Sequence, residues 1–139
     1  MSIAERYGQY AEAFEESYID DDWSRIGQYF TQDAVYEGEP EARGRQAVVD
    51  KLQGAVNGFD RLMDSRTPGF QDPTVDGDTL TMNWTVSYTK AGLPDLVIKG
   101  RETAVFEGDC IASLRDDFDP SAEEAMGAWM AAHGESLQG

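Results

Sequence analysis

The chain has 139 residues, of which 40% are hydrophobic and 11% aromatic, and this suits a single domain over residues 1–139. It carries 27 acidic residues against 11 basic ones, a formal net charge of -16. Nucleic acids and anionic membranes both bind clustered Lys and Arg side chains, so this charge disfavours both partners. A solvated acidic surface is the simplest interpretation of the charge, and a functional acidic face is the alternative.

Cysteine and histidine occur once each, as Cys110 and His133. One cysteine cannot form an internal disulfide, and its position in a predicted strand indicates a small buried side chain. One histidine gives little basis for a His-based metal site or a Ser-His-Asp triad, so no metal and no cofactor are expected. Residues 1–6 lack the apolar core of a signal peptide, and no stretch is long enough to span a membrane. We therefore expect a cytoplasmic protein.

Three helices are predicted in the N-terminal part. Apolar side chains recur at spacings of three and four over residues 2–19, which indicates an amphipathic helix. Asp20-Asp21-Asp22 interrupts this helix and can cap a second one over Trp23–Phe30. A short strand over Ala34–Glu37 precedes a third helix, which covers about residues 45–57.

The hydrophobic pattern then changes to the period of two that strands have. Leu62–Phe70 is weakly strand-like and is interrupted by Pro68-Gly69, and Asp76-Gly77-Asp78 is a hairpin turn. Leu80–Tyr88 alternates apolar with polar side chains and predicts the clearest strand of the chain.

A last hairpin joins two strands, Asp95–Phe106 and Cys110–Phe118, and Pro120-Ser121 opens a C-terminal helix. Helices collected on one face of a curved antiparallel sheet give an α+β domain. Such a sheet wraps the first helix and leaves a cone-shaped pocket between them. The C-terminal helix has an apolar side that can dock on the domain or on a dimer partner, made of Met126, Trp129 and Met130.

The last hairpin carries acidic residues where a buried face is expected. Glu102 and Asp116 lie on its two strands, so their side chains can approach within about 5–8 Å as a direct or diagonal pair. Carboxylates are seldom buried without a reason. Two of them in an apolar cavity raise at least one pKa, so that one can act as an acid and the other as a base.

A structural interpretation of the same acids stays open. If the turn places a bulge, Glu102 can face outward and pair with Arg115. Asp116 can hydrogen-bond backbone amides at the end of the sheet. Asp117 is then a solvated side chain, and Asp119, which precedes Pro120, can cap the last helix.

Several short phrases, in order along nearly the whole chain, carry a family resemblance. They are Asp33-Ala34-Val35-Tyr36, Gly44-Arg45, Asp76-Gly77-Asp78 with Trp84-Thr85, Gly100-Arg101-Glu102, Phe106, Gly108-Asp109, Ile111 and Arg115-Asp116-Asp117-Phe118-Asp119-Pro120. In this order they resemble the NTF2-like superfamily and, within it, the SnoaL-like branch. The resemblance implies a cone-shaped α+β fold with three N-terminal helices packed on a curved antiparallel sheet, usually a homodimer packed through its sheets. It also implies a pocket with polar residues from the first helix, the first strand and the last three strands.

Three activities of the superfamily match this sequence only in part. Ketosteroid isomerases use a helix tyrosine, a base aspartate and a protonated aspartate, and the matching positions here are Phe14, Gly38 and Glu102. Limonene-type epoxide hydrolases use an Arg-x-Asp pair that Met82–Ser87 lacks, although Asp116 matches their other aspartate. SnoaL-type polyketide cyclases use one acid/base aspartate, and Asp116 resembles it.

These observations predict a cone-shaped pocket that binds a small, mostly apolar, oxygenated ligand. Asp116 with Glu102 is the expected acid/base pair, for chemistry of the cyclase, isomerase or hydrolase kind. The alternative is a non-catalytic ligand-binding or dimerisation domain of the same fold, and a third is a protein-binding module with an exposed apolar patch near Trp129. The expected aromatic walls of the pocket are Phe14, Tyr18, Tyr36, Trp84 and Tyr88.

Overall fold

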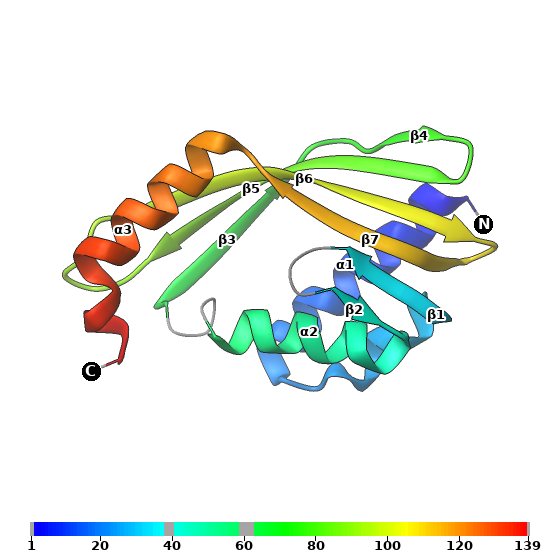
Figure 1. The fold of residues 1–139 in the computed structure, drawn as a ribbon, viewed down its shortest axis with the longest axis horizontal. Coiled ribbons are helices and arrows are strands. Elements are labelled where there is room, and N and C mark those ends of the chain that lie inside the picture. Colours follow the sequence, from blue (N-terminus) through cyan, green and yellow to red (C-terminus); the bar gives the residue numbers. More distant parts are fainter. Residues whose placement is uncertain (1, 38–40, 59–62, 139) are drawn as a thin grey trace.

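The structure is a computed structural model that describes residues 2–37, 41–58 and 63–138. Two positions discussed above, Gly38 and Leu62, lie outside these ranges. Figure 1 shows a long curved sheet with the N-terminal helices at one end and the C-terminal helix at the other. The predicted α+β class is confirmed.

The two N-terminal helices begin and end at the acidic and hydroxyl residues that the sequence offers as caps. Helix α1 covers Ile3–Asp20, and Asp21 ends it in the left-handed conformation with φ 58°. Asp22 then accepts a hydrogen bond from the backbone N–H of Ser24 and caps η1, Trp23–Tyr29. The predicted break between two helices is therefore present. However, the second segment is a 3₁₀-helix of seven residues, which is long for this form.

The sheet contains seven strands and is antiparallel except at one pair. Its path is β2-β1-β7-β6-β5-β3, with β4 also paired to β5. Strand β1 starts earlier than predicted and runs parallel to β7, and the short β2 was not predicted at all. The bounds are Phe30–Glu37 for β1, Ala42–Arg43 for β2, Ser65–Phe70 for β3, Thr74–Asp76 for β4, Thr79–Thr89 for β5, Leu96–Glu107 for β6 and Cys110–Phe118 for β7.

Proline is tolerated inside β3 because this strand lies at the edge of the sheet. Pro68 is opposite Val86 of β5, and none of the described strands lies on the other side of β3. A residue without a backbone N–H costs little at such an edge. The sequence signal that weakened the strand prediction therefore reflects an edge position.

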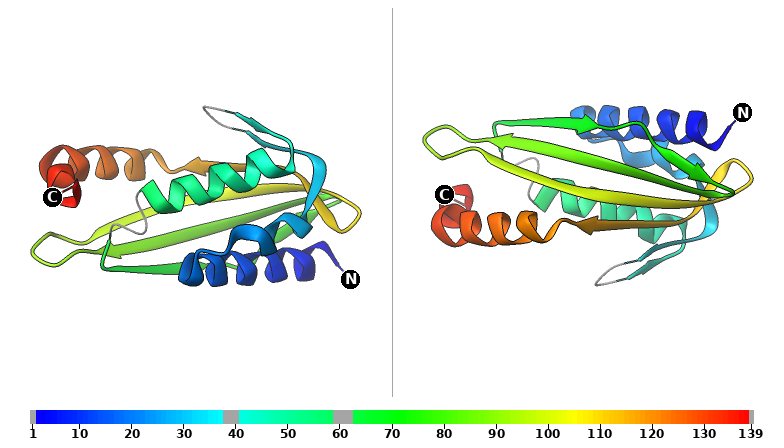
Figure 2. Two further views of the ribbon diagram at one scale, coloured as in Figure 1. Left: turned by 90° about the horizontal axis from the view of Figure 1, so that it is seen from below. Right: turned by 90° about the horizontal axis from the view of Figure 1, so that it is seen from above.

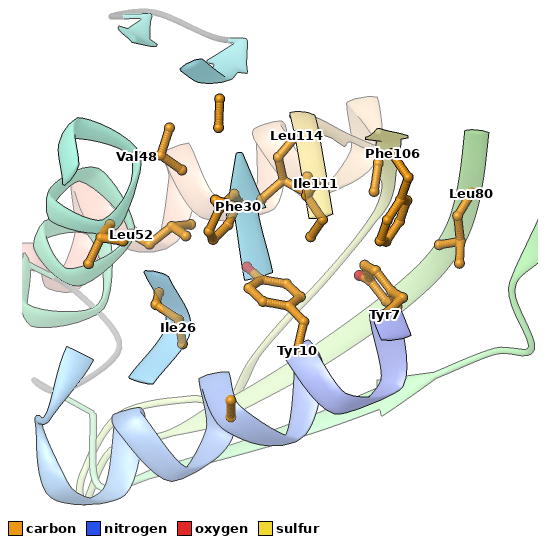
Figure 3. Packing of buried hydrophobic residues seen from close by; sticks show 14 of the residues in the cluster. Tyr7, Tyr10, Ile26, Phe30, Val48, Leu52, Leu80, Phe106, Ile111 and Leu114 are labelled. Atoms are coloured by element: carbon orange, nitrogen blue, oxygen red, sulfur yellow. The ribbon is translucent and has the colours of Figure 1, made fainter. Parts of the chain in front are cut away.

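Helices cover one face of the sheet in two groups. The first group, α1, η1 and α2 (Arg45–Gly58), packs on the sheet around Phe30, Leu80 and Phe106 (Figure 3). The second is α3, Pro120–Gln138, whose Trp129 packs with Tyr88 and Leu96 of the same sheet face. In both views of Figure 2, strands β5 and β6 lie between α1 and α3. Among the described helices, none is both long and apolar enough to cross a bilayer.

Candidate active site

A single unpaired residue in β7 brings the two predicted acids together. Near the turn Phe106 is opposite Ile111, but the next pair is Val105 with Ser113, so Ala112 has no partner. This β-bulge shifts the register by one residue. As a result Glu102 lies directly opposite Asp116.

The structural alternative raised from the sequence expected a bulge to pair Glu102 with Arg115. The bulge in the structure instead separates these two residues. With regular pairing from the turn, Arg115 would be opposite Glu102; instead Arg115 is opposite Thr103 and binds the Asp117 carboxylate at 3.0 Å. The burial pattern agrees, because Ile111 and Leu114 are both buried although they are three residues apart. Side chains of a regular strand share a face only at even spacings.

Two tyrosines hold the acid pair from neighbouring elements. The Tyr7 hydroxyl of α1 donates to Glu102 Oε1 at 2.9 Å, and the Tyr36 hydroxyl of β1 donates to Asp116 Oδ2 at 2.6 Å. Each carboxyl therefore has a donor from outside the hairpin. Glu102 and Asp116 are also close enough, as direct neighbours across the two strands, for each to shift the pKa of the other.

The pKa values of both acids are raised, and burial is the first cause in each case. For Glu102 the second cause is the charge of Asp116, which raises its pKa well above the ordinary value. For Asp116 the hydrogen bonds from Glu102 and Tyr36 act against the rise in pKa, since they stabilise its carboxylate. Both shifts favour a proton retained by the pair, more strongly at Glu102, where the pKa lies well above its ordinary value. Burial also raises the pKa of Tyr7 and of Tyr36, which keeps both hydroxyls protonated.

Trp84 and Gly100 shape the wall beside Asp116. Gly100 is opposite both Trp84 and Phe118, and the two rings meet edge to face with centroids 5.6 Å apart. A Cβ on Gly100 would lie 2.7 Å from Trp84 Cζ2, so only glycine leaves room for the indole. The indole N–H is buried near Asp116 and lowers its pKa, but it makes no hydrogen bond of regular geometry with any described residue.

The pair faces a cavity of about 340 Å³ between the two groups of helices. Six of the seven residues predicted for the site line it: Phe14, Tyr36, Trp84, Tyr88, Glu102 and Asp116. Tyr18 is not among the lining residues; its ring lies 5.2 Å from the Arg66 guanidinium instead. Both carboxyl groups, of Glu102 and Asp116, thus lie in one cavity. The walls of this cavity are mainly aromatic and aliphatic.

Neither Tyr7 nor Tyr10 was predicted as a site residue from the sequence, yet both line the cavity. They belong to the buried stripe of α1, where an aliphatic side chain would serve packing equally well. A hydroxyl on such a stripe needs a polar partner, and this was the signal available in the sequence. Tyr10 lies among the rings of Tyr7, Phe14 and Phe30.

The other acidic residues of the hairpin have structural roles. The Asp119 carboxylate accepts hydrogen bonds from the Ser121 backbone N–H and hydroxyl, as expected for a cap of α3. Asp117 is exposed and pairs with Arg115. Cys110 is half-buried, where a fully buried side chain was expected. Within the described ranges, no three His, Cys, Asp or Glu side chains gather closely enough to hold a metal ion.

Comparison with solved structures gives the same fold. A candidate polyketide cyclase from Sinorhizobium meliloti is 19% identical, with a TM-score of 0.57, over 78% of this chain and 94% of that one. A second, from Xanthomonas campestris pv. campestris, is 20% identical, with a TM-score of 0.58, over 94% and 98%. An NTF2-like protein of unknown function from Exiguobacterium sp. 255-15 is 18% identical, with a TM-score of 0.62, over 86% and 99%. The expected NTF2-like fold is confirmed.

Sequence comparison identifies the branch of that fold. No curated protein matches the chain. The model of the SnoaL-like domain matches residues 8–117, which span α1 to nearly the end of β7 and include both acids. The chain therefore belongs to the SnoaL-like domain family.

Proposed function

We propose that the protein binds a small, mostly apolar, oxygenated molecule in its cavity and that Glu102 and Asp116 exchange a proton with it. The observation that carries this proposal is the direct opposition of two carboxyls that both line a mainly apolar cavity. Groups whose pKa values are shifted by burial and by a charged partner are typical of acid/base sites. The polyketide cyclase descriptions of two structural neighbours support an oxygenated substrate.

The pair suits proton transfer next to a carbonyl group. The ionised Asp116 would take a proton from the carbon beside the carbonyl, and the C–H electron pair would form the carbon–carbon double bond of an enol. Glu102 would give its proton to the carbonyl oxygen, and the reverse transfer would regenerate a ketone. Isomerisation, ring closure and addition of water can all use this pair of half-steps.

A non-catalytic binding role is the second candidate, and one observation favours it. Tyr7 and Tyr36 each already donate a hydrogen bond to one of the two carboxyls. Such a closed network can simply present a polar patch to a ligand. The two roles differ in whether a bound ketone exchanges its α-protons.

The deciding experiment begins with an unbiased ligand screen of the pure protein by native mass spectrometry. Ketones that bind are then followed by NMR for exchange of their α-protons with deuterium. We expect exchange with the natural protein and at least about a hundredfold slower exchange with Asp116→Asn, since removing a general base costs this much. Asp33→Asn is the matched control, because Asp33 is exposed on β1 outside the cavity. Equal exchange in both variants would leave only the binding role.

We further propose that the protein is a homodimer packed through the outer face of the sheet. Val97 and Val105 are exposed on β6, and Lys99 and Arg101 lie on the same face of an otherwise acidic chain. Two such faces can meet with less charge repulsion than any acidic surface of the chain. Sedimentation of Val97→Glu should give the monomer mass if this face is the interface, and an unchanged dimer would exclude it.

A further inference from the structure

The cavity has a second polar position, formed by Arg66 of β3 and Glu15 of α1. Arg66 Nη1 lies 2.6 Å from Glu15 Oε1, and both side chains line the cavity. The Arg66 side chain is only 8% exposed, whereas Glu15 is 30% exposed. A buried arginine is rare without an acidic partner, and this ion pair supplies one.

This ion pair lies at the opposite end of the cavity from Glu102 and Asp116. Glu15 follows Tyr7 by a little over two turns of α1, and Tyr7 is the residue that touches Glu102. The two positions are therefore about 12 Å apart along the helix, at about 1.5 Å per residue. On the sheet, Arg66 is opposite Tyr88, while Glu102 is opposite Met82, so the two ends are separated along β5 as well.

The charges at the two ends determine which ligand fits between them. Arg66 is paired with Glu15 at one end of the cavity, and the other end carries the two acids Glu102 and Asp116. These are the only charged side chains among the described lining residues. A carboxylate ligand would add a second acid to one guanidinium and would enter a chain with a formal charge of -16. A cationic ligand would meet the Arg66 charge at close range.

We infer that Arg66 and Glu15 form a second binding subsite, which takes an uncharged hydroxyl group at the far end of the ligand. A hydroxyl both donates and accepts, so it can bond to the carboxylate and to the guanidinium at once. Glu15 Oε2 has no hydrogen-bond partner among the described residues and is available as the acceptor. This inference rests on the ligand-binding part of the function proposed above, but not on the proton-transfer step.

The test compares three methyl ketones that share one alkyl chain and differ only at the far end. The chain spans about 12 Å, the separation of the two polar positions along α1. The end groups are a hydroxyl, a carboxylate and a trimethylammonium group, and binding is measured by isothermal titration calorimetry. We expect the hydroxyl ketone to bind at least about tenfold more tightly than either charged ketone. Equal affinities, or tighter binding of a charged ketone, would overturn the inference.

A charge-changing variant sharpens the test. Glu15→Gln keeps the size of the side chain but removes one negative charge beside Arg66. We expect the ratio of carboxylate to hydroxyl affinity to rise about tenfold or more in this variant. The control is Glu16→Gln, which removes the same charge from a neighbouring side chain that is 67% exposed and lies outside the cavity. An unchanged ratio in Glu15→Gln would exclude the subsite.

The outcomes separate this inference from the proposed function. The preference among the three ketones is a ratio of binding constants and needs no turnover, so it can hold even if Asp116 proves not to be a base. Equal binding of all three with normal proton exchange would remove the subsite alone. No binding of any of them would overturn the ligand-binding function and the subsite with it.

Discussion

Glu102 lies directly opposite Asp116 across β6 and β7, and the register that pairs them depends on the unpaired Ala112. Both side chains line one cavity, and the Asp116 charge helps to raise the pKa of Glu102. Because burial raises both pKa values, protonation of these two acids favours the folded state. For exposed acids paired with a cation, ionisation favours the folded state instead.

The first prediction concerns stability against pH. The pKa of Glu102 is raised well above its ordinary value of 4.5, so the unfolded chain loses this proton at lower pH than the folded protein does. The stabilising contribution is fully present below about pH 4.5 and falls by about 1.4 kcal/mol per pH unit above it, until the folded protein also loses the proton. Glu102→Gln cannot ionise. We expect urea unfolding to show the variant gaining stability relative to the natural protein as the pH rises.

Exposed acids also contribute to the pH dependence of the unfolding free energy. Their contribution cancels in the difference between the natural protein and Glu102→Gln. Asp20, Asp22 and Asp64 have lowered pKa values from hydrogen bonds and act in the opposite sense, but they are present in both proteins. A difference that stays flat from acid to neutral pH would mean that Glu102 is ionised in the folded protein.

The second prediction concerns coupling between the two acids. Asp116→Asn removes the charge that raises the Glu102 pKa, and its amide can still accept from Tyr36. At neutral pH we expect this variant to be at least as stable as the natural protein, since it no longer buries a carboxylate. In a double-mutant cycle with Glu102→Gln, the unfolding free energies should deviate from additivity by about 0.5–3 kcal/mol, as for residues in direct contact. Additive effects would indicate that the two carboxyls do not share a proton.

The register that creates the site was only partly predictable from the sequence. The two strands and the turn between them follow from alternation and glycine, and both acids were placed on the hairpin. Direct opposition depends on the bulge, and its one sequence signal is the spacing of Ile111 and Leu114, which are three residues apart and both buried. Apolar residues three positions apart are also typical of helices, so this pattern alone does not locate a bulge.

The donors to the acid pair were harder to predict than the acids. Tyr7, Tyr10 and Tyr18 all fall on the apolar stripe of α1, and periodicity does not separate a ring that reaches the cavity from one that stays at its margin. Tyr7 reaches Glu102, whereas Tyr18 packs on Arg66. That distinction depends on where the helix axis crosses the sheet, which is a tertiary property.

The third prediction concerns Tyr36. Its hydroxyl lowers the pKa of Asp116 by donating to the carboxylate, so this contribution is present when Asp116 is ionised and disappears as falling pH protonates it. We expect Tyr36→Phe to destabilise the protein by about 1.5–3 kcal/mol at about pH 8 and by less at about pH 4. Chemical denaturation at both pH values measures the difference.

Tyr29→Phe is the control for this hydroxyl deletion. The Tyr29 ring packs against Tyr10 and under Arg6, outside the lining of the cavity. Its removal should have the same small effect at both pH values. A Tyr36→Phe cost that does not depend on pH would mean that Tyr36 contributes by packing alone.

The fourth prediction concerns Gly100, where the wall of the cavity depends on the missing side chain. An alanine Cβ would lie 2.7 Å from Trp84 Cζ2 and 2.7 Å from the Asp117 carbonyl oxygen. The indole can move, but the carbonyl belongs to the backbone of β7, so we expect Gly100→Ala to destabilise the protein by about 1–3 kcal/mol. A displaced Trp84 should also shift the tryptophan emission and weaken ligand binding, because this ring lines the cavity next to Asp116.

Gly127→Ala provides a control with the opposite expected sign. Gly127 lies inside α3, and a Cβ there would meet no atom within 4 Å. Alanine favours the helix over glycine, so this variant should gain about 0.5–1 kcal/mol with unchanged emission. If Gly100→Ala were as stable as the natural protein, the sheet would open at this point without a cost in free energy. The close fit of Trp84 over Gly100 would then not be the contact that holds the indole beside Asp116.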